Sequence, residues 1–411
     1  MEINLNLEYY PKLNDLLLST SIDRIKTNRN KWDHPFFFDT KSYLDFKQIN
    51  QIVNPFLADT IQNVIVLGTG GSIQTLLALK HLSKKKVYPI TSSRAIELKQ
   101  CLLKTNPENS IVIPISRGGE TLDVNSTIGT FLNRGYNFLG LSSSGTMNKI
   151  LKEIDCPIMD VPDLSGRFAG SVTNVGIIPA MISGIKIEEF LRGLEKGYER
   201  FSNYETNITI EFASYLYNLY KKGFKSVFSM PYSKNIEGTV GLWVQGISES
   251  TGKDEKGMIG TFQEAPLCQH SVLEYLLGGM KGFVIPVLWT IENEILDIGL
   301  TSNIDYVNGK SAQTIVNYQA DATFQALIQQ GVPTAKITLK DSSEESMGFL
   351  VAFVLSSVYY LCLLMETNWA NNPKVIIGKQ ICNNALRDNI DKEKRKDIRQ
   401  EIARKVFSNF Y

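Results

Sequence analysis

The chain has 411 residues, of which 43% are hydrophobic and 21% charged, and its formal net charge is +1. This length and apolar content suffice for two or three domains with sizeable cores. The near-zero charge argues against nucleic acid or an anionic membrane surface as a partner. Five cysteines without a C-x-x-C pair, beside three histidines, argue against a structural zinc site and fit a reducing compartment. The start "MEINLNLEYYPKL" lacks the basic flank and apolar run of a signal peptide, so we expect a cytoplasmic protein.

The first strong pattern is "NVIVLGTGGSIQTLLAL", residues 63–79. Residues 63–67 are apolar and β-branched, which predicts a buried strand, and apolar residues then recur at helical spacing from Ile73. Ser72 stands where a helix N-cap belongs. A glycine turn that enters a helix presents free backbone N–H groups at the positive end of the helix dipole. The pattern therefore predicts that this glycine turn binds an anion.

The absence of nucleotide-binding motifs narrows the kind of anion that this turn is expected to bind. A dinucleotide fingerprint requires glycine at position 73, where this chain has isoleucine, and no acid follows the next predicted strand, residues 87–90. The chain also has no G-x-x-x-x-G-K-[ST] motif. Phosphate compounds smaller than nucleotides remain as the expected ligands.

Apolar strands at residues 64–67, 87–90, 111–115 and 138–141 alternate with stretches of helical length, which predicts a parallel sheet. The third strand leads into "SRGGETLD", a second loop of small and hydroxyl residues. Two such loops on one sheet can enclose one phosphate, although an ordinary connection capped by Ser and Thr fits this loop equally well. The small and hydroxyl residues of this loop are Ser116, Gly118, Gly119 and Thr121, and Arg117 adds a positive charge.

A second, looser array has strands at 226–230, 283–288 and 336–339, and an amphipathic helix, residues 185–201, bridges the two arrays. We therefore expect two doubly wound lobes with sites at the carboxyl ends of their strands. Residues 347–365 carry no charge and are long enough to cross a bilayer. They lack basic anchors at either end, which favours a buried core helix over a membrane span.

Single polar residues further along the chain are candidates for chemistry. Glu249, in "VQGISESTGKDEKG", has the character of a general base held on a loop, although a solvated charged loop is the simpler alternative. His270 begins an apolar helical pattern, where a capping or core histidine is as plausible as a catalytic one. Arg167 and Lys379 are single cations among small or apolar neighbours, and either fits a structural role.

Taken in order, "GTGGS", "SRGGET", "SGRFAGSVTNVG", "QGISESTGK", "QHS" and "NPKVIIGKQ" resemble successive motifs of the glucose-6-phosphate isomerase family along most of the chain. The resemblance implies two sugar isomerase domains of flavodoxin-like, doubly wound α/β type, followed by a C-terminal helical segment. It also implies a homodimer that interconverts glucose 6-phosphate and fructose 6-phosphate without a cofactor or a metal. The corresponding segments are residues 1–45 (N-terminal), 46–185 (first sugar isomerase domain), 186–215 (bridging helix), 216–370 (second sugar isomerase domain) and 371–411 (C-terminal helices).

The resemblance also implies roles for particular residues. Glu249 matches the base that moves a proton between C1 and C2, and Arg167 matches the arginine that stabilises the enediolate. His270 and Lys379 match the pair associated with ring opening, with the histidine supplied by the partner subunit. Residues expected at the sugar and phosphate are Gly71, Ser72, Ser116, Arg117, Gly118, Thr121 and Gln245.

The chain departs from the family pattern at three places. Thr251 replaces an asparagine, "APLC" replaces "GTNG" before the histidine, and the "NPKVIIGKQ" segment is shortened and lacks a glutamine. These changes keep open an isomerase of another phosphosugar such as mannose 6-phosphate. A non-enzymatic sugar-phosphate sensor is a second alternative, but it should lack the base, the arginine and the ring-opening residues, which are all present here.

Overall fold

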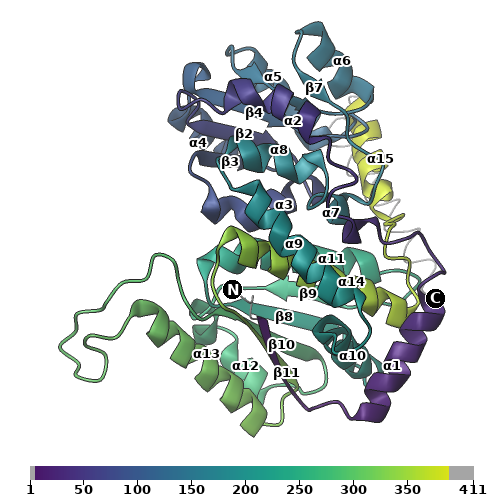
Figure 1. Ribbon diagram of the computed structural model, residues 1–411, viewed down its shortest axis with the longest axis vertical. Helices are drawn as coiled ribbons and strands as arrows, with labels where there is room; N and C mark the ends of the chain where they lie inside the picture. Colours follow the sequence, from purple (N-terminus) through teal and green to yellow (C-terminus); the bar gives the residue numbers. More distant parts are fainter. Residues whose placement is uncertain (1–4, 388–411) are drawn as a thin grey trace. The chain divides into compact units, whose positions relative to one another are not determined.

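The computed structural model describes residues 5–387, and the chain forms two compact units, Met1–Ala370 and Asn371–Tyr411. The first unit contains two parallel β-sheet lobes, each covered by helices on both faces (Figure 1). The second unit is described as far as Arg387 and contains α15 (Val375–Arg387). The expected α/β class with two parallel-sheet lobes is confirmed.

The sheet of the first lobe has the strand order β3-β2-β4-β5, and all of its pairs are parallel. Every residue of β2 and β4 is buried, as expected of strands covered on both faces. A short parallel pair, β6-β7, continues the lobe through a bridge between Ile115 and Leu141. The strands are β2 (Asn63–Leu67), β3 (Lys86–Ile90), β4 (Ser110–Pro114), β5 (Asn137–Phe138), β6 (Gly140–Leu141) and β7 (Ile158–Met159).

Helices cover the first sheet in two layers. Alternate residues of β2 point to opposite layers, so that Val64 packs with α3 and α8 while Ile65 packs with α4, α5 and α6. The helices of this lobe are α2 (Phe46–Val53), α3 (Gly71–Leu79), α4 (Ala95–Lys104), α5 (Leu122–Leu132), α6 (Gly145–Glu153), α7 (Gly166–Ala169) and α8 (Asn174–Ile182).

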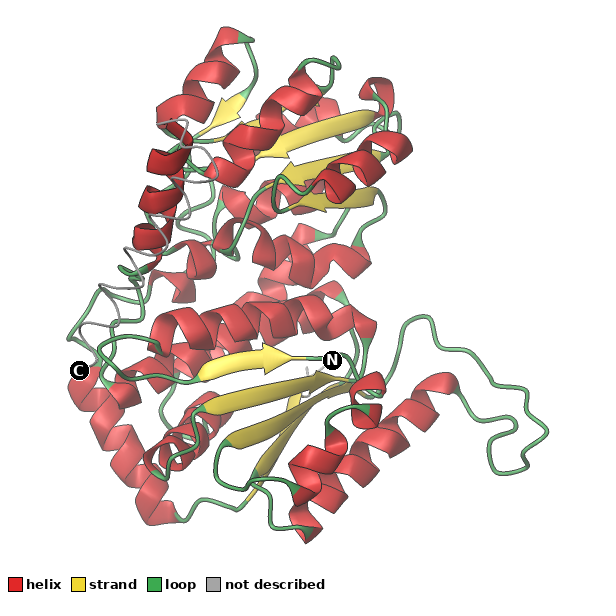
Figure 2. Cartoon of the chain, turned by 180° about the vertical axis from the view of Figure 1, so that it is seen from behind, coloured by secondary structure: helices red, strands yellow, loops and turns green. Residues whose placement is uncertain are grey.

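The sheet of the second lobe has the order β1-β11-β10-β8-β9 and is parallel except for its edge strand β1 (Figure 2). Helices α10, α11 and α14 lie on one face and α12 and α13 on the other. The elements are β1 (Leu5–Tyr10), β8 (Ser226–Pro231), β9 (Ile259–Phe262), β10 (Val284–Ile291), β11 (Thr334–Leu339), α1 (Asp15–Asn28), α9 (Ile187–Ser202), α10 (Ile208–Lys221), α11 (Glu237–Thr251), α12 (Leu273–Gly278), α13 (Ala312–Gln329) and α14 (Glu344–Met365).

Short 3-10 helices lie between several of these elements. They are η1 (Phe36–Phe38), η2 (Asn54–Phe56), η3 (Lys80–Leu82), η4 (Pro107–Asn109), η5 (Lys234–Ile236) and η6 (Leu267–His270).

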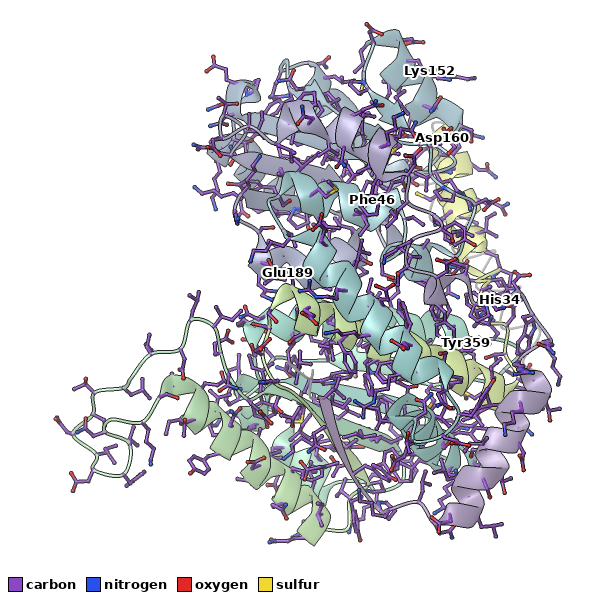
Figure 3. All side chains as sticks on the ribbon, in the orientation of Figure 1. His34, Phe46, Lys152, Asp160, Glu189 and Tyr359 are labelled. Atoms are coloured by element: carbon purple, nitrogen blue, oxygen red, sulfur yellow. The ribbon has the colours of Figure 1, made fainter. Side chains whose placement is uncertain are left out.

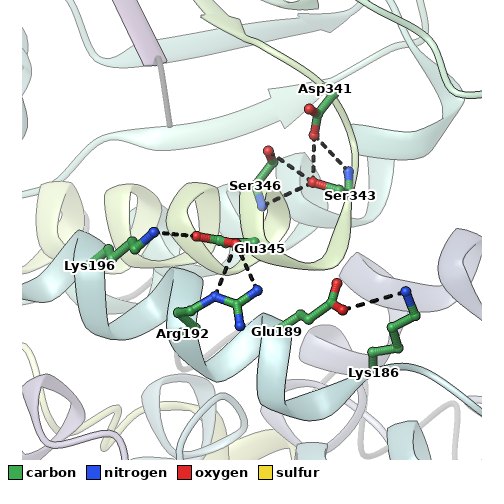
Figure 4. A network of polar contacts seen from close by, with 8 residues as sticks. All are labelled: Lys186, Glu189, Arg192, Lys196, Asp341, Ser343, Glu345 and Ser346. Atoms are coloured by element: carbon green, nitrogen blue, oxygen red, sulfur yellow. Dashed lines mark hydrogen bonds and ion pairs between the residues drawn. The ribbon is translucent and has the colours of Figure 1, made fainter. Parts of the chain in front are cut away.

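Helix α14 is the apolar segment that is long enough to span a membrane. The whole of its most apolar 18-residue window is buried inside the structure, as expected for a core helix. Glycines let the bridging helix α9 approach it closely: a Cβ on Gly348 would lie 2.1 Å from the carbonyl oxygen of Phe190. At the N-terminal end of α14, Glu345 accepts hydrogen bonds from Arg192 and Lys196 of α9 (Figure 4). Charged contacts at one end and small residues along the seam thus fix α9 against α14.

The sequence expectations need local corrections. The strand expected at residues 138–141 is divided between β5 and β6, and β1 and β9 were not anticipated. Ser72 is not the N-cap of α3; Gly70 holds that position, with φ of 56°, and Ser72 is the second residue of the helix. The turn needs a positive φ at the cap, which glycine adopts without strain.

Candidate functional site

The first glycine loop leaves β2 and meets two candidate site residues from distant parts of the chain. A Cβ on Gly70 would lie 3.2 Å from Nε2 of Gln245, and a Cβ on Gly71 would lie 2.4 Å from the backbone nitrogen of Arg167. Larger residues at these positions would push the loop away from α7 and α11. The glycines predicted to approach an anion thus also bring this loop against Gln245 and Arg167.

The second loop follows β4, which pairs in parallel with β2, so both loops emerge at the same edge of the sheet. The Oγ of Ser116 lies 2.8 Å from Oγ1 of Thr121, which closes the loop. Arg117 and Gly118 are exposed, and a Cβ on Gly118 would meet no atom within 4 Å. Arg117 pairs with the exposed carboxylate of Asp163. The loop therefore presents open backbone and a cation, which suits a phosphate, while its two hydroxyls bond to each other and Ser116 is buried.

Arg167 lies on α7, and only 3% of its side chain is exposed. Its Nε donates a 2.6 Å hydrogen bond to Oγ of Ser250, and its Nη2 donates to the carbonyl oxygen of Trp369. Its Nη1 lies 3.6 Å from Oε2 of Glu249. Burial lowers the pKa of Arg167 from its usual value, and the Glu249 carboxylate opposes this effect. The guanidinium is thus held rigidly with one edge toward Glu249.

Aromatic rings support the carbonyl that anchors Arg167. The Trp369 ring centroid lies 5.4 Å from that of Phe37, 5.0 Å from that of Phe168 and 5.8 Å from that of Tyr359. Tyr359 projects from α14 (Figure 3). This packing limits movement of Trp369 and hence of the hydrogen bond that its carbonyl accepts.

Glu249 occupies the last turn of α11, so its expected placement on a loop is wrong. The helix continues to Thr251 because the chain breaks the pattern only at Gly252, its C-cap residue. The side chain of Glu249 is 30% exposed, and its Oε1 accepts a 3.3 Å hydrogen bond from Nε2 of Gln245, one helical turn earlier. A partly exposed carboxylate beside a buried guanidinium suits proton abstraction next to a carbonyl group, with stabilisation of the developing negative charge.

Within one chain, His270 does not lie with these residues. His270 is the last residue of η6, whose Cys268 packs with α12 and α13, so within one chain η6 lies on the face of the second sheet opposite α11. Lys379 belongs to α15 of the second unit. The structure therefore brings together Gly71, Arg167, Gln245 and Glu249, with Ser72 on the same loop as Gly71, and gathers Ser116, Arg117, Gly118 and Thr121 on the neighbouring loop.

The residues that hold the Arg167 side chain in place could not be identified from the sequence. Ser250 and Lys253 lie within a motif that was recognised, but nothing in their spacing indicated which atoms they contact. Trp369 acts through a backbone carbonyl, which carries no sequence signal. In residues 5–387, no group of three or more His, Cys, Asp or Glu side chains is arranged to hold a metal ion.

Curated proteins with similar sequences include several glucose-6-phosphate isomerases. No protein-family model matches the chain. It is 26% identical to the glucose-6-phosphate isomerase of Mycoplasmopsis pulmonis over 401 residues (88% of this chain, 93% of that protein). It is also 26% identical to that of Methanocaldococcus jannaschii over 344 residues (78% and 83%).

Solved structures show the same fold. A hypothetical protein from Thermus thermophilus superimposes with a TM-score of 0.82 at 19% identity, covering 94% of this chain and all of that one. A glucose-6-phosphate isomerase from Chlamydia trachomatis gives a TM-score of 0.76 at 15% identity, covering 97% and 92%. The resemblance predicted from the ordered motifs is confirmed: the chain is a homologue of the glucose-6-phosphate isomerases across most of its length.

Proposed function

We propose that this protein is an aldose-ketose isomerase that interconverts glucose 6-phosphate and fructose 6-phosphate through an enediolate, in glycolysis and gluconeogenesis. The observation that carries the proposal is the pair of Glu249 and Arg167 beside the first glycine loop, with an Nη1–Oε2 distance of 3.6 Å. The names of the homologues support this substrate pair over mannose 6-phosphate and over a sensor without activity.

In the proposed mechanism, the loops at Gly71–Ser72 and Ser116–Thr121 bind the phosphate and orient the open-chain sugar. The Glu249 carboxylate removes the C2 proton of the aldose, and the electron pair moves toward the carbonyl oxygen at C1. Arg167 stabilises the resulting enediolate. Glu249 then returns the proton to C1 while the hydroxyl proton of O2 passes to O1 and the carbonyl forms at C2. This gives the ketose, so the protons and electrons balance without a cofactor.

We assign ring opening to His270 of the partner subunit together with Lys379, as the family resemblance implies. The location of η6 opposite α11 supports a histidine from a second copy, because its own η6 lies on the other side of the sheet. The proposal therefore includes a homodimer. We also propose that the protein works in the cytoplasm, a reducing compartment that its five free cysteines support. The proposal includes no nucleic acid and no membrane as a partner.

Purified protein assayed with glucose 6-phosphate, fructose 6-phosphate and mannose 6-phosphate in the presence of EDTA tests this function. We expect interconversion of the first two at a rate that the chelator does not change. Preference for mannose 6-phosphate would identify a related isomerase instead. Binding without turnover of any of the three would identify a sensor, and activity that EDTA abolishes and a divalent metal restores would contradict the metal-free mechanism.

A further inference from the structure

Lys253 is a half-buried cation that interacts electrostatically with Arg167 and has no role in the mechanism above. Its Nζ donates a 2.7 Å hydrogen bond to the carbonyl oxygen of Ser250 and another to the carbonyl oxygen of Asn368. Lys253 therefore ties the end of α11 to the segment that follows α14. Even partial burial of an ammonium group has a desolvation cost, and a structural link alone does not require a charge at this place.

The two segments that Lys253 joins are the two that hold Arg167. Ser250 accepts a hydrogen bond from Nε of Arg167 through its side chain, and Trp369, the residue after Asn368, accepts one from Nη2 through its carbonyl. A shift of either segment would turn the guanidinium relative to Glu249. The two hydrogen bonds of Lys253 join these same two segments.

We propose that Lys253 is a positioning residue for the isomerisation: it fixes the two segments that aim Arg167 at the enediolate. This inference rests on the proposed function of the site. Burial lowers the pKa of Lys253 to about 8, and the charged or titratable groups around it are Cys362, Arg167, Glu249 and Asp254. Loss of its proton above that pH removes the charge that strengthens both hydrogen bonds.

The chain offers a matched control in Lys256. Its Nζ donates to the carbonyl oxygens of Met365 and Glu366, at the C-terminal end of the same helix α14. Each lysine thus binds at least one backbone carbonyl at or just after the end of α14. Of the two, Lys253 is the one whose hydrogen bonds reach the segments that hold the guanidinium.

The test compares Lys253→Met, Lys253→Arg and Lys256→Met in steady-state isomerisation. We expect Lys253→Met to lower kcat by roughly 10-fold to 100-fold, the effect of displacing a catalytic group by about 1 Å, with little change in KM. Lys256→Met should keep the wild-type kcat. Lys253→Arg keeps a cation and should recover part of the kcat that Lys253→Met loses.

A double-mutant cycle shows whether Lys253 acts through Arg167. In an Arg167→Lys background, Lys253→Met should reduce kcat little further, because the group that it positions has already changed. Independent, multiplying effects would overturn the inference, and so would equal losses in Lys253→Met and Lys256→Met. A pH profile tests the inference without Lys253→Met, should that variant not fold. The kcat of wild-type protein should fall above about pH 8, and Lys253→Arg should remove this fall.

The absence of that fall in the wild-type profile, or its persistence in Lys253→Arg, would contradict the inference. These results are separate from the proposed function, which fails only if wild-type protein does not isomerise the sugar phosphate. A wild-type enzyme that is active and unaffected by Lys253→Met would remove the role of Lys253 and leave the proposed function standing.

Discussion

Arg167 and Glu249 differ in exposure, and this difference suits their proposed roles. Arg167 is 3% exposed and held by fixed partners, whereas Glu249 is 30% exposed and so remains accessible to a substrate. A cation that is already fixed in place stabilises the negative charge of the enediolate with little reorganisation energy. An accessible carboxylate can reach both C1 and C2 of the sugar. The site thus places a fixed charge beside an accessible carboxylate.

Glu249→Gln tests the base. The amide keeps the size of the side chain and a hydrogen-bond acceptor for Gln245, but it does not accept the C2 proton at neutral pH. We expect KM to change little and kcat to fall by roughly 10²-fold to 10⁴-fold or more, the range for loss of a general base. An unchanged kcat in steady-state assays would place the base elsewhere, with Glu264 as the next residue to replace.

The ion pair between Arg117 and Asp163 predicts an effect on substrate affinity. Arg117 and Asp163 are both largely exposed, with 45% and 88% of their side chains accessible. Asp163→Asn removes a carboxylate that competes with the substrate phosphate for Arg117. Because exposed ion pairs are worth about 0.2–1 kcal/mol, we expect KM to fall by up to roughly fivefold at unchanged kcat. A rise in KM would show that Asp163 orients Arg117 for the phosphate.

At the scale of the helix, glycines at the α9–α14 seam predict a stability difference. Gly348→Ala would place a Cβ 2.1 Å from a backbone oxygen of α9, so the helices must separate. We expect a loss of roughly 1–3 kcal/mol in the free energy of unfolding, as for overpacked cores. In α5, a Cβ on Gly129 meets no atom within 4 Å, so Gly129→Ala should stabilise by roughly 0.5–1 kcal/mol. Urea denaturation of both variants measures the contrast, and equal effects would contradict it.

Elements with a strong local pattern were predictable from the sequence. The strands β2, β3 and β4 and the helix α14 follow from apolar runs of characteristic length, because buried elements are built mainly from apolar residues. The edge strand β1 was not predictable because its partner β11 lies more than 300 residues away in sequence. The helical position of Glu249 was missed because its polar neighbours look like a loop, although tertiary packing buries Ser250 and Thr251 beside it.

The sequence indicated which residues belong to the candidate site, but it did not indicate which atoms they contact. Motif order indicated Arg167, Gln245 and Glu249, and the structure places these three together. The contacts of Arg167 with Ser250 and with the Trp369 carbonyl join residues 83 and 202 positions apart, which only the folded chain brings together. The roles of all these residues remain predictions that the variants above test.

At the scale of the whole molecule, the proposed active site requires two chains. His270→Ala and Glu249→Gln proteins are each expected to be inactive, since each lacks one essential group. After subunit exchange, a mixed dimer with His270 from one chain and Glu249 from the other has one intact site, so some activity should return. Continued inactivity of demonstrated mixed dimers would contradict a histidine supplied by the partner.

The most direct test of the central claim follows the hydrogen at C2 of glucose 6-phosphate in deuterium oxide by NMR. The mechanism predicts that wild-type protein exchanges this hydrogen with solvent, that Arg167→Lys exchanges it more slowly, and that Glu249→Gln loses exchange together with turnover, because both pass through the same proton abstraction. Exchange by Glu249→Gln at the wild-type rate would contradict the assignment of Glu249 as the base.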